Sequence, residues 1–351
     1  MQEYEIIKQG RTLLAVSRES KPSQRTIASY REKARRIWQR AKDMQGDEVE
    51  NLIACAKQTR SVATWFSRRA ALLHMLCLGV EKLLAEQDKM QRALRDAHVP
   101  PDAPEWAGWR ELIVRLRGRM AWIERLQGEP GPAIENRKPR HSKRKDMHGL
   151  PEDWRERLIA RLPKYRIAAL VQAVTGCRPD ELVRGVKLSI MNGELTAEII
   201  GAKVTEKSGQ PWRRLSWPVE SDSPLVAMLV EEVQNGLVVA QIADAKAYSG
   251  AVRAAGKREW PRRQTSLSPY CFRHAAASDM KAAGMEDAAI SQALGHCADV
   301  AKSYYGQWQQ GRKSGGVAPA KVEASRSVRV TKPVIGSAIT KLGMREARPK
   351  T

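Results

Sequence analysis

The chain has 351 residues, 42% of them hydrophobic, and carries 61 lysines and arginines against 39 aspartates and glutamates, for a formal charge of +22. The apolar content excludes a disordered chain, no apolar run is long enough to span a membrane, and the N-terminus lacks the pattern of a signal peptide. The charge favours a polyanionic partner, and nucleic acid is a better candidate than an anionic membrane. A basic surface that only keeps the protein soluble would have the same composition.

The first part of the chain is predicted to be helical. Residues 1–20 carry little pattern and are assigned to an N-terminal extension, and residues 21–130 are assigned to a helical domain. Apolar residues recur at helical spacing in three long stretches, at 26–44, 61–87 and 105–127. Each stretch also contains arginines, and Arg68 and Arg69 are candidates for contact with DNA phosphates. A solvated basic face is the other interpretation.

Residues 131–149 are predicted to be a linker. Glycine and proline open the segment, and six of the nine residues of RKPRHSKRK are basic. Such a run does not fold alone, so it is either a plain tether or a segment that lies along DNA. The candidate DNA-binding residues of this linker are Arg137, Lys138, Arg140, Lys143, Arg144 and Lys145.

A second domain is predicted over residues 150–310. It begins with helices that end near Gly176, and the apolar period then changes to two in VKLSI, ELTAEIIGAKV and PWRRLSWPV, which indicates a three-stranded antiparallel sheet. Arg213 and Arg214 on the third strand are candidates for DNA contact or for simple solvation. Helical patterning then resumes and continues to Trp308. The expected fold class is therefore mainly α with a small antiparallel β-sheet.

The remaining residues, 311–351, form a basic tail punctuated by glycine, serine and proline. Within it, VIGSAITKLGM has the spacing of a short amphipathic helix that docks on a neighbour. The five cysteines have no paired spacing and indicate reduced thiols in the cytoplasm. Cys271, His274, His296 and Cys297 lack a second ligand pair at zinc-finger spacing, so neither a metal nor another cofactor is expected.

The region from Arg178 to Tyr305 supplies the residue types that DNA strand cleavage needs. Two guanidinium groups can clamp the oxygens of a phosphodiester and stay charged at neutral pH. A tyrosine hydroxyl can attack phosphorus, and the resulting ester conserves the bond energy for rejoining without ATP. The departing 5′ oxygen needs a proton, for which a lysine on a turn is a suitable donor.

Four motifs present these residue types in order: TGCRPDEL, YCFRH, LGH and SYYG. Together they resemble the signature R…K…HxxR…[HW]…Y of the tyrosine recombinases of the phage-integrase family. The resemblance covers residues 150–310, whereas residues 21–130 resemble the family's core-binding domain only by position and composition. It implies a helical core-binding domain followed by a tyrosine-recombinase catalytic domain.

The resemblance assigns roles to five residues. Arg178 matches the first arginine, and Glu181 matches its acidic companion, which orients neighbouring groups. Arg273 matches the second arginine, and His274 is its structural neighbour. His296 stands at the second His/Trp position, where it binds the phosphate or positions the nucleophile.

The remaining positions are less closely fixed by the motifs. Lys203 fits the sheet lysine that protonates the leaving group, with Lys207 as its competitor. Tyr270 stands where the family usually has histidine; a phenol can donate a hydrogen bond to phosphate but carries protons less readily at neutral pH. Tyr305 matches the nucleophile, and the adjacent Tyr304 is expected to pack, because neighbouring helical residues point about 100° apart.

The implied activity is site-specific DNA recombination through a 3′-phosphotyrosine intermediate, without metal or ATP. The resemblance also implies a homotetramer on two DNA core sites, with helper proteins as further partners and a cytoplasmic location on the nucleoid. Two alternatives remain open at this point. One is an enzyme like a type IB topoisomerase, and the other is a catalytically weak DNA-binding accessory protein, which the tyrosine at position 270 favours.

Overall fold

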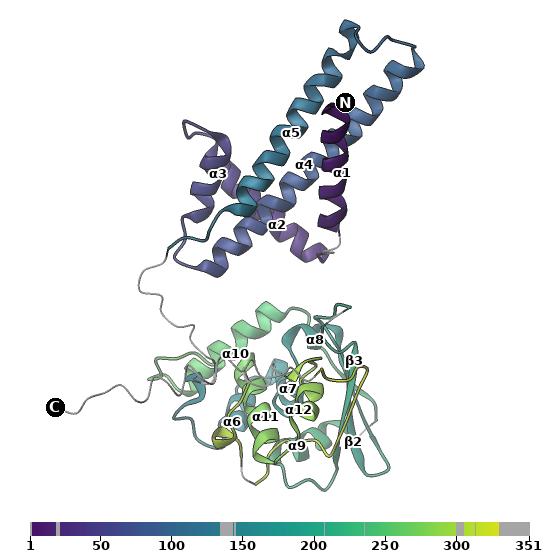
Figure 1. Cartoon of the computed structure of the whole chain (residues 1–351). Coiled ribbons are helices and arrows are strands. Elements are labelled where there is room, and N and C mark those ends of the chain that lie inside the picture. Colours follow the sequence, from purple (N-terminus) through teal and green to yellow (C-terminus); the bar gives the residue numbers. More distant parts are fainter. Residues whose placement is uncertain are drawn as a thin grey trace, which may run out of the picture. The chain divides into compact units, whose positions relative to one another are not determined.

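The computed structural model describes residues 2–18, 22–133, 143, 145–206, 208–234, 236–299, 305–312 and 314–329. The chain divides into two compact units, residues 1–139 and 140–351, each with its own hydrophobic core (Figure 1). Among the described residues, no helix combines the length and the apolar character that crossing a membrane would require.

The N-terminal unit is helical throughout its regular elements. Its described elements are α1 (Gln2–Arg18), α2 (Gln24–Ala41), α3 (Glu48–Lys57), α4 (Val62–Asp96), a 3-10 turn (Pro104–Trp106) and α5 (Ala107–Gly128). The long helices α4 and α5 pack side by side, as Figure 1 shows, and α2 crosses α4. Side-chain oxygens cap three of the helices at Ser23, Asp47 and Ser61, each accepting from backbone N–H groups of the first turn.

Helix α1 differs from the expectation for residues 1–20. Instead of an extension with little pattern, it is a 17-residue helix packed on α4 and α5. Ile7 and Leu14 lie seven positions apart on one face and are both buried in the core of this unit. Gly10 between them is buried as well, so one face of a mostly polar segment docks this helix on α4 and α5.

The C-terminal unit combines helices with a small sheet whose central strands alternate between buried and more exposed residues. Its helices are α6 (Trp154–Ala160), α7 (Arg166–Thr175), α8 (Pro179–Arg184), α9 (Pro224–Val233), α10 (Ala245–Glu259), α11 (Pro269–Ala282) and α12 (Asp287–Ala293). Short 3-10 turns occupy Lys145–Met147, Pro163–Tyr165 and Trp308–Gln310. The strands are β1 (Val186–Met191), β2 (Glu194–Ile200), β3 (Trp212–Pro218), β4 (Val238–Ala240) and β5 (Lys321–Ala324).

The sheet has five antiparallel strands in the order β4-β1-β2-β3-β5, so the prediction of three strands is wrong. Strand β4 lies inside a segment predicted to be helical. That helix ends at Val233, and Gly236 follows with a φ of 120°, before two β-branched valines pair with β1. Strand β5 pairs with β3 and lies within the predicted tail.

The predicted tail is therefore partly integrated into the C-terminal unit. Val317 is fully buried, and its carbonyl accepts from Nε1 of Trp217 at 3.0 Å. VIGSAITKLGM, the segment expected to dock on a neighbour, lies outside the described residues.

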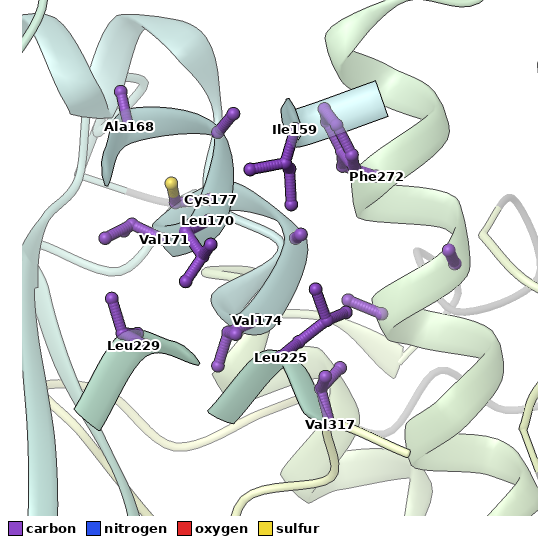
Figure 2. Close-up of a cluster of buried hydrophobic side chains, with 14 of the residues drawn as sticks. Ile159, Ala168, Leu170, Val171, Val174, Cys177, Leu225, Leu229, Phe272 and Val317 are labelled. Carbon is purple, nitrogen blue, oxygen red and sulfur yellow. The ribbon is translucent and has the colours of Figure 1, made fainter. Parts of the chain in front are cut away.

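The core of the C-terminal unit joins α7 and α11. Figure 2 shows Val171 and Val174 of α7 in the same apolar cluster as Phe272 of α11 and Leu225 of α9. Phe272 also stacks on Trp154 of α6, with ring centroids 5.5 Å apart. Since most regular elements are helices and the strands form one small antiparallel sheet, the predicted fold class is confirmed. The packing of α7 on α11 fixes the position of Arg273, the residue that follows Phe272.

Candidate active site

Helix α11 places Arg273 in the interior of the C-terminal unit. Pro269 occupies the first turn, where its missing N–H leaves no helical bond unmade. The Arg273 side chain is fully buried. Its Nη1 donates to the carbonyl of Gly176 at 2.7 Å, and its Nη2 donates to the carbonyl of Leu294 at 2.5 Å and to Nε2 of His296 at 2.9 Å. The guanidinium group is thus held by two segments, the turn at Gly176 and the turn from Leu294 to His296.

The charge of Arg273 is poorly compensated. In the described part of the chain no carboxylate pairs with it directly, and its buried Nε has no hydrogen-bond partner. Burial, and then the nearby Arg178, lower the pKa of this guanidinium to about 10, so it stays charged at neutral pH. A buried cation whose acceptors are two carbonyls and a neutral imidazole is costly, and this arrangement suits a site that receives an anion.

Arg178 is held beside this cation by Glu181. Arg178 stands at the start of α8, where its backbone N–H donates to Glu181 Oε2 at 2.8 Å and its Nη1 donates to Oε1 at 2.9 Å. Arg213 of β3 reaches the same carboxylate, with Nη2 2.8 Å from Oε2 and Nη1 3.3 Å from Oε1. Burial alone would raise the pKa of Glu181, but Arg213 and Arg178 outweigh it and hold that pKa well below its usual range.

Three arginines and one glutamate therefore form a basic cluster: Arg178, Arg213, Arg273 and Glu181. Each is no more than 8% exposed, and the cluster carries two positive charges in excess. Burying an unpaired charge costs on the order of several kcal/mol even after the structure relaxes. The repulsion among these arginines is therefore tolerable only if the binding of an anion compensates for it. A phosphodiester is an anion that two guanidinium groups can bind through paired N–H donors.

The turn after α12 brings His296 to the basic cluster. Gly295 adopts a φ of 72°, and a Cβ atom there would lie 2.8 Å from Nη1 of Arg213, so only glycine fits this position. Burial, and then the charges of Arg273 and Arg178, lower the pKa of His296 to about 3. The imidazole is therefore neutral, and its Nε2 accepts from Arg273, because a guanidinium group can only donate. The remaining hydrogen then resides on Nδ1.

Tyr305 lies against the same groups. Cζ of Arg273 stands 4.7 Å from the centroid of the Tyr305 ring. That ring lies between two imidazoles, 5.0 Å from His274 and 5.5 Å from His296 between centroids. The structure thus brings the predicted nucleophile to the second predicted arginine and the predicted phosphate-binding histidine. Tyr304 lies outside the described residues.

Helix α11 also holds the backbone that follows Tyr305. Nζ of Lys281 donates to the carbonyls of Tyr305 and Gly306 at 2.7 and 3.1 Å. Nδ1 of His274 accepts from the N–H of Gly306 at 3.4 Å, and Oγ of Ser278 accepts from the N–H of Gln307 at 3.0 Å. One helix therefore carries Arg273 and contacts the backbone that follows the tyrosine beside it.

Lys203 and Tyr270 lie outside this hydrogen-bonded network. Lys203 is exposed in the loop between β2 and β3, and within the described ranges its side chain makes no hydrogen bond or ion pair. The loop itself is fixed, because Nη1 of Arg326 donates to the carbonyls of Thr205 and Gly209 at 2.7 and 3.3 Å. Tyr270 is half-buried one turn before Arg273. Lys207 lies outside the described residues.

The assignment of Arg213 to a DNA-binding surface is corrected by the structure. Its side chain is fully buried, and besides Glu181 it donates from Nε to the carbonyl of Ala293 at 2.7 Å. The alternation of strand β3 explains the difference, since Arg213 shares the inward face with Leu215 and Trp217. The sequence contains this signal, because the alternation of apolar residues along the strand places Arg213 on its apolar side.

The other predicted DNA-binding residues differ in their surroundings. Arg214 is exposed and pairs with Glu198 and Glu323. Arg68 and Arg69 are half-buried in the N-terminal unit and donate to backbone carbonyls. In the linker, Lys143 pairs with the buried Asp146 and Lys145 is exposed, whereas the residues outside the described ranges are Arg137, Lys138, Arg140 and Arg144.

One residue beside the site was not predicted. Gln210 is 1% exposed, and its Nε2 donates to the carbonyls of His296 and Arg326 at 3.0 and 2.8 Å. Its Oε1 accepts from the N–H of Arg326 at 2.8 Å. Gln210 thereby ties the β2–β3 loop to the His296 turn. No local pattern marks it, because its partners are 86 and 116 positions away.

No family model and no curated protein sequence matches the chain. Among solved structures, the chain is similar to a XerA recombinase, with 14% identity, a TM-score of 0.33 and coverage of 99% of this chain and 100% of that one. It is similar to a XerH site-specific recombinase bound to its difH substrate, with 14% identity, a TM-score of 0.35 and coverage of 82% and 93%. It is also similar to a lambda integrase tetramer bound to a Holliday junction, with 12% identity, a TM-score of 0.43 and coverage of 86% and 76%.

Proposed function

We propose that this chain is a tyrosine-type site-specific DNA recombinase. The observation that carries the proposal is a buried excess of positive charge against a tyrosine ring, with Arg273 4.7 Å from the ring of Tyr305. An excess of buried cations needs an anionic ligand, and the adjacent phenol is a nucleophile suited to phosphorus. A phosphodiester of DNA meets both requirements, and the charge of +22 favours a DNA partner.

In this proposal the Tyr305 oxygen attacks the scissile phosphorus. The phenol gives up its proton to water, the 3′-phosphotyrosine ester forms as the bond from phosphorus to the 5′ oxygen breaks, and the 5′ oxygen leaves with a proton donated by Lys203. Arg178 and Arg273 bind the phosphate oxygens and stabilise the charge that develops on them. Attack by the 5′ hydroxyl of another strand reverses the step, so the ester supplies the energy of rejoining.

Three further side chains complete the proposed reaction. His296 is neutral, and its Nδ1–H can donate to a phosphate oxygen or to the phenol oxygen. Lys203 supplies the proton to the 5′ oxygen, for which an exposed side chain on a fixed loop is well suited. Tyr270 donates a hydrogen bond in place of the usual histidine.

The proposed assembly is a homotetramer on two DNA core sites. The support for this assembly is the resemblance of the motifs to tyrosine recombinases, which implies four chains on two sites, each with its own nucleophile. Such an enzyme works in the cytoplasm on nucleoid DNA, and helper proteins that bend DNA or set the direction of exchange are further proposed partners.

Covalent trapping tests the proposal. A core site is first recovered by selecting random duplexes that the full-length chain retains, and it is then nicked near the cleavage position so that the cut strand diffuses away. The wild type and Tyr304→Phe are expected to form a covalent protein–DNA adduct, and Tyr305→Phe is expected to form none. Equal adduct with Tyr305→Phe would overturn the assignment of the nucleophile, and no adduct with the wild type would overturn the function. Relaxation of supercoils without exchange products would instead identify a topoisomerase-like enzyme.

A further inference from the structure

We propose that Arg213 is a positioning residue of this active site, which holds Arg178 through Glu181 and the His296 turn through Ala293. This inference rests on the proposed function and deepens it. Arg213 was expected to touch DNA or solvent, yet its side chain is fully buried on the inward face of β3.

The first link runs through Glu181. Nη2 and Nη1 of Arg213 lie 2.8 and 3.3 Å from Oε2 and Oε1 of that carboxylate, which is the paired geometry that only arginine makes. Arg178 uses the same two oxygens, through its Nη1 and its backbone N–H. Both carboxylate oxygens are therefore fixed from two sides, and the Arg178 guanidinium group has one orientation.

The second link runs to the turn that carries His296. Nε of Arg213 donates at 2.7 Å to the carbonyl of Ala293, the last residue of α12. The next carbonyl, that of Leu294, accepts from Arg273, and Gly295 lies against Nη1 of Arg213 so closely that no Cβ fits. Arg213 thereby sets the path of the backbone on which both Arg273 and His296 depend.

Arg213 also has an electrostatic effect. Glu181 alone would neutralise Arg178, and a neutralised pair attracts a phosphate weakly. With Arg213 on the same carboxylate, the three side chains keep one positive charge in excess next to Arg273. Since charge interactions are stronger in the interior than in water, this excess remains available to the phosphate.

The test compares Arg213→Lys and Arg213→Met with Arg166→Met. Arg166 is a matched control, because it also pairs with a glutamate, Glu232, at 2.7 Å in the same unit but lies half-exposed. The two Arg213 variants are expected to slow single-turnover adduct formation by about 10–100-fold, as loss of a group that orients a catalytic residue does. DNA affinity is expected to stay within about 3-fold, and Arg166→Met is expected to keep the wild-type rate. Thermal melting reports whether each variant folds.

A double-mutant cycle separates positioning from a merely structural role. If Arg213 acts through Arg178, then Arg213→Lys costs less than about 3-fold when Arg178 is already lysine. Should Arg213→Met fail to fold, the double variant Arg213→Met with Glu181→Gln also removes the buried carboxylate charge. This double variant is expected to fold and to form the adduct as slowly as the single variants are expected to. A wild-type rate for Arg213→Lys, or fully additive losses in the cycle, would overturn the inference alone. Absence of adduct from the wild type would overturn the proposed function itself.

Discussion

In the described residues of the N-terminal unit, arginine side chains are exposed or half-buried, whereas in the C-terminal unit Arg155, Arg178, Arg213 and Arg273 are buried. The N-terminal cations line surfaces, and a groove of about 440 Å³ has Lys33, Arg36, Arg40 and Arg68 along it. The C-terminal cations are fixed by carbonyls and by two buried carboxylates, Glu181 and Asp279.

This difference separates two uses of the same side chain. An exposed arginine contributes a screened charge that attracts DNA at long range and tolerates replacement by lysine. A buried arginine with several fixed acceptors contributes geometry, and lysine cannot reproduce its fork of N–H donors. A cation that acts by its charge alone should therefore tolerate lysine, and one that acts by its position should not.

The largest effect is expected for Arg273→Lys. The variant keeps the charge but cannot reach Gly176, Leu294 and His296 together, so the rate of adduct formation should fall by about 10³-fold, with DNA affinity nearly unchanged. Single-turnover trapping at saturating protein measures the rate, and filter binding measures the affinity. A rate within about 3-fold of the wild type would show that Arg273 acts by charge alone.

A smaller loss, about 10²-fold, is expected for Lys203→Ala, because removal of a general acid leaves an alkoxide without its proton. A substrate with sulfur in place of the bridging 5′ oxygen should restore the rate, since a thiolate leaves without protonation. Lys187→Ala is the control, an exposed lysine on β1 of the same sheet. If the Lys203→Ala rate stayed low with the sulfur substrate, Lys203 would not be the general acid. Lys207 would then be the remaining candidate.

Much of the site could be inferred from sequence, because its motifs are short and local. TGCRPDEL encodes a helix end, a proline at the first turn and the Arg178–Glu181 pair within a few residues. LGH encodes a turn at Gly295, where the positive φ and the close approach of Arg213 require glycine. The grouping of Arg178, Arg273, His296 and Tyr305 into one site comes from the resemblance to tyrosine recombinases, because these residues are far apart in the sequence.

The contacts that close the site are long-range, and the sequence does not display them. Strand β5 pairs Lys321 with Ser216, more than a hundred positions earlier, in a segment whose composition is typical of a tail. Arg326 and Gln210 meet over a similar separation. Arg213 is the intermediate case, because its strand pattern predicted an inward side chain, while its basic character favoured the surface.

The buried imidazole predicts a change of stability with pH. The pKa of His296 is lowered from 6.5 to about 3 by burial and by Arg273, so the unfolded chain binds a proton that the folded chain does not. Stability should therefore fall as the pH drops below about 6.5, and His296→Gln should lose this dependence. Melting temperatures between pH 7 and pH 5 test it, above the range in which Glu181 takes up a proton. An unchanged acid dependence in His296→Gln would assign it to another group.

The smallest effect is expected in the N-terminal groove, at the exposed Arg40. There Arg40→Lys should bind DNA as the wild type does, and Arg40→Ala should reduce the slope of log affinity against log salt by about 0.9, the loss of one phosphate contact. Lys89→Ala, an exposed lysine of α4 outside the groove, is the control. Neither Arg40 variant should alter the cleavage rate at saturation, because no reacting atom depends on its position. If Arg40→Lys slowed cleavage, the groove would position DNA by geometry as the basic cluster does, and the contrast between the two units would fail.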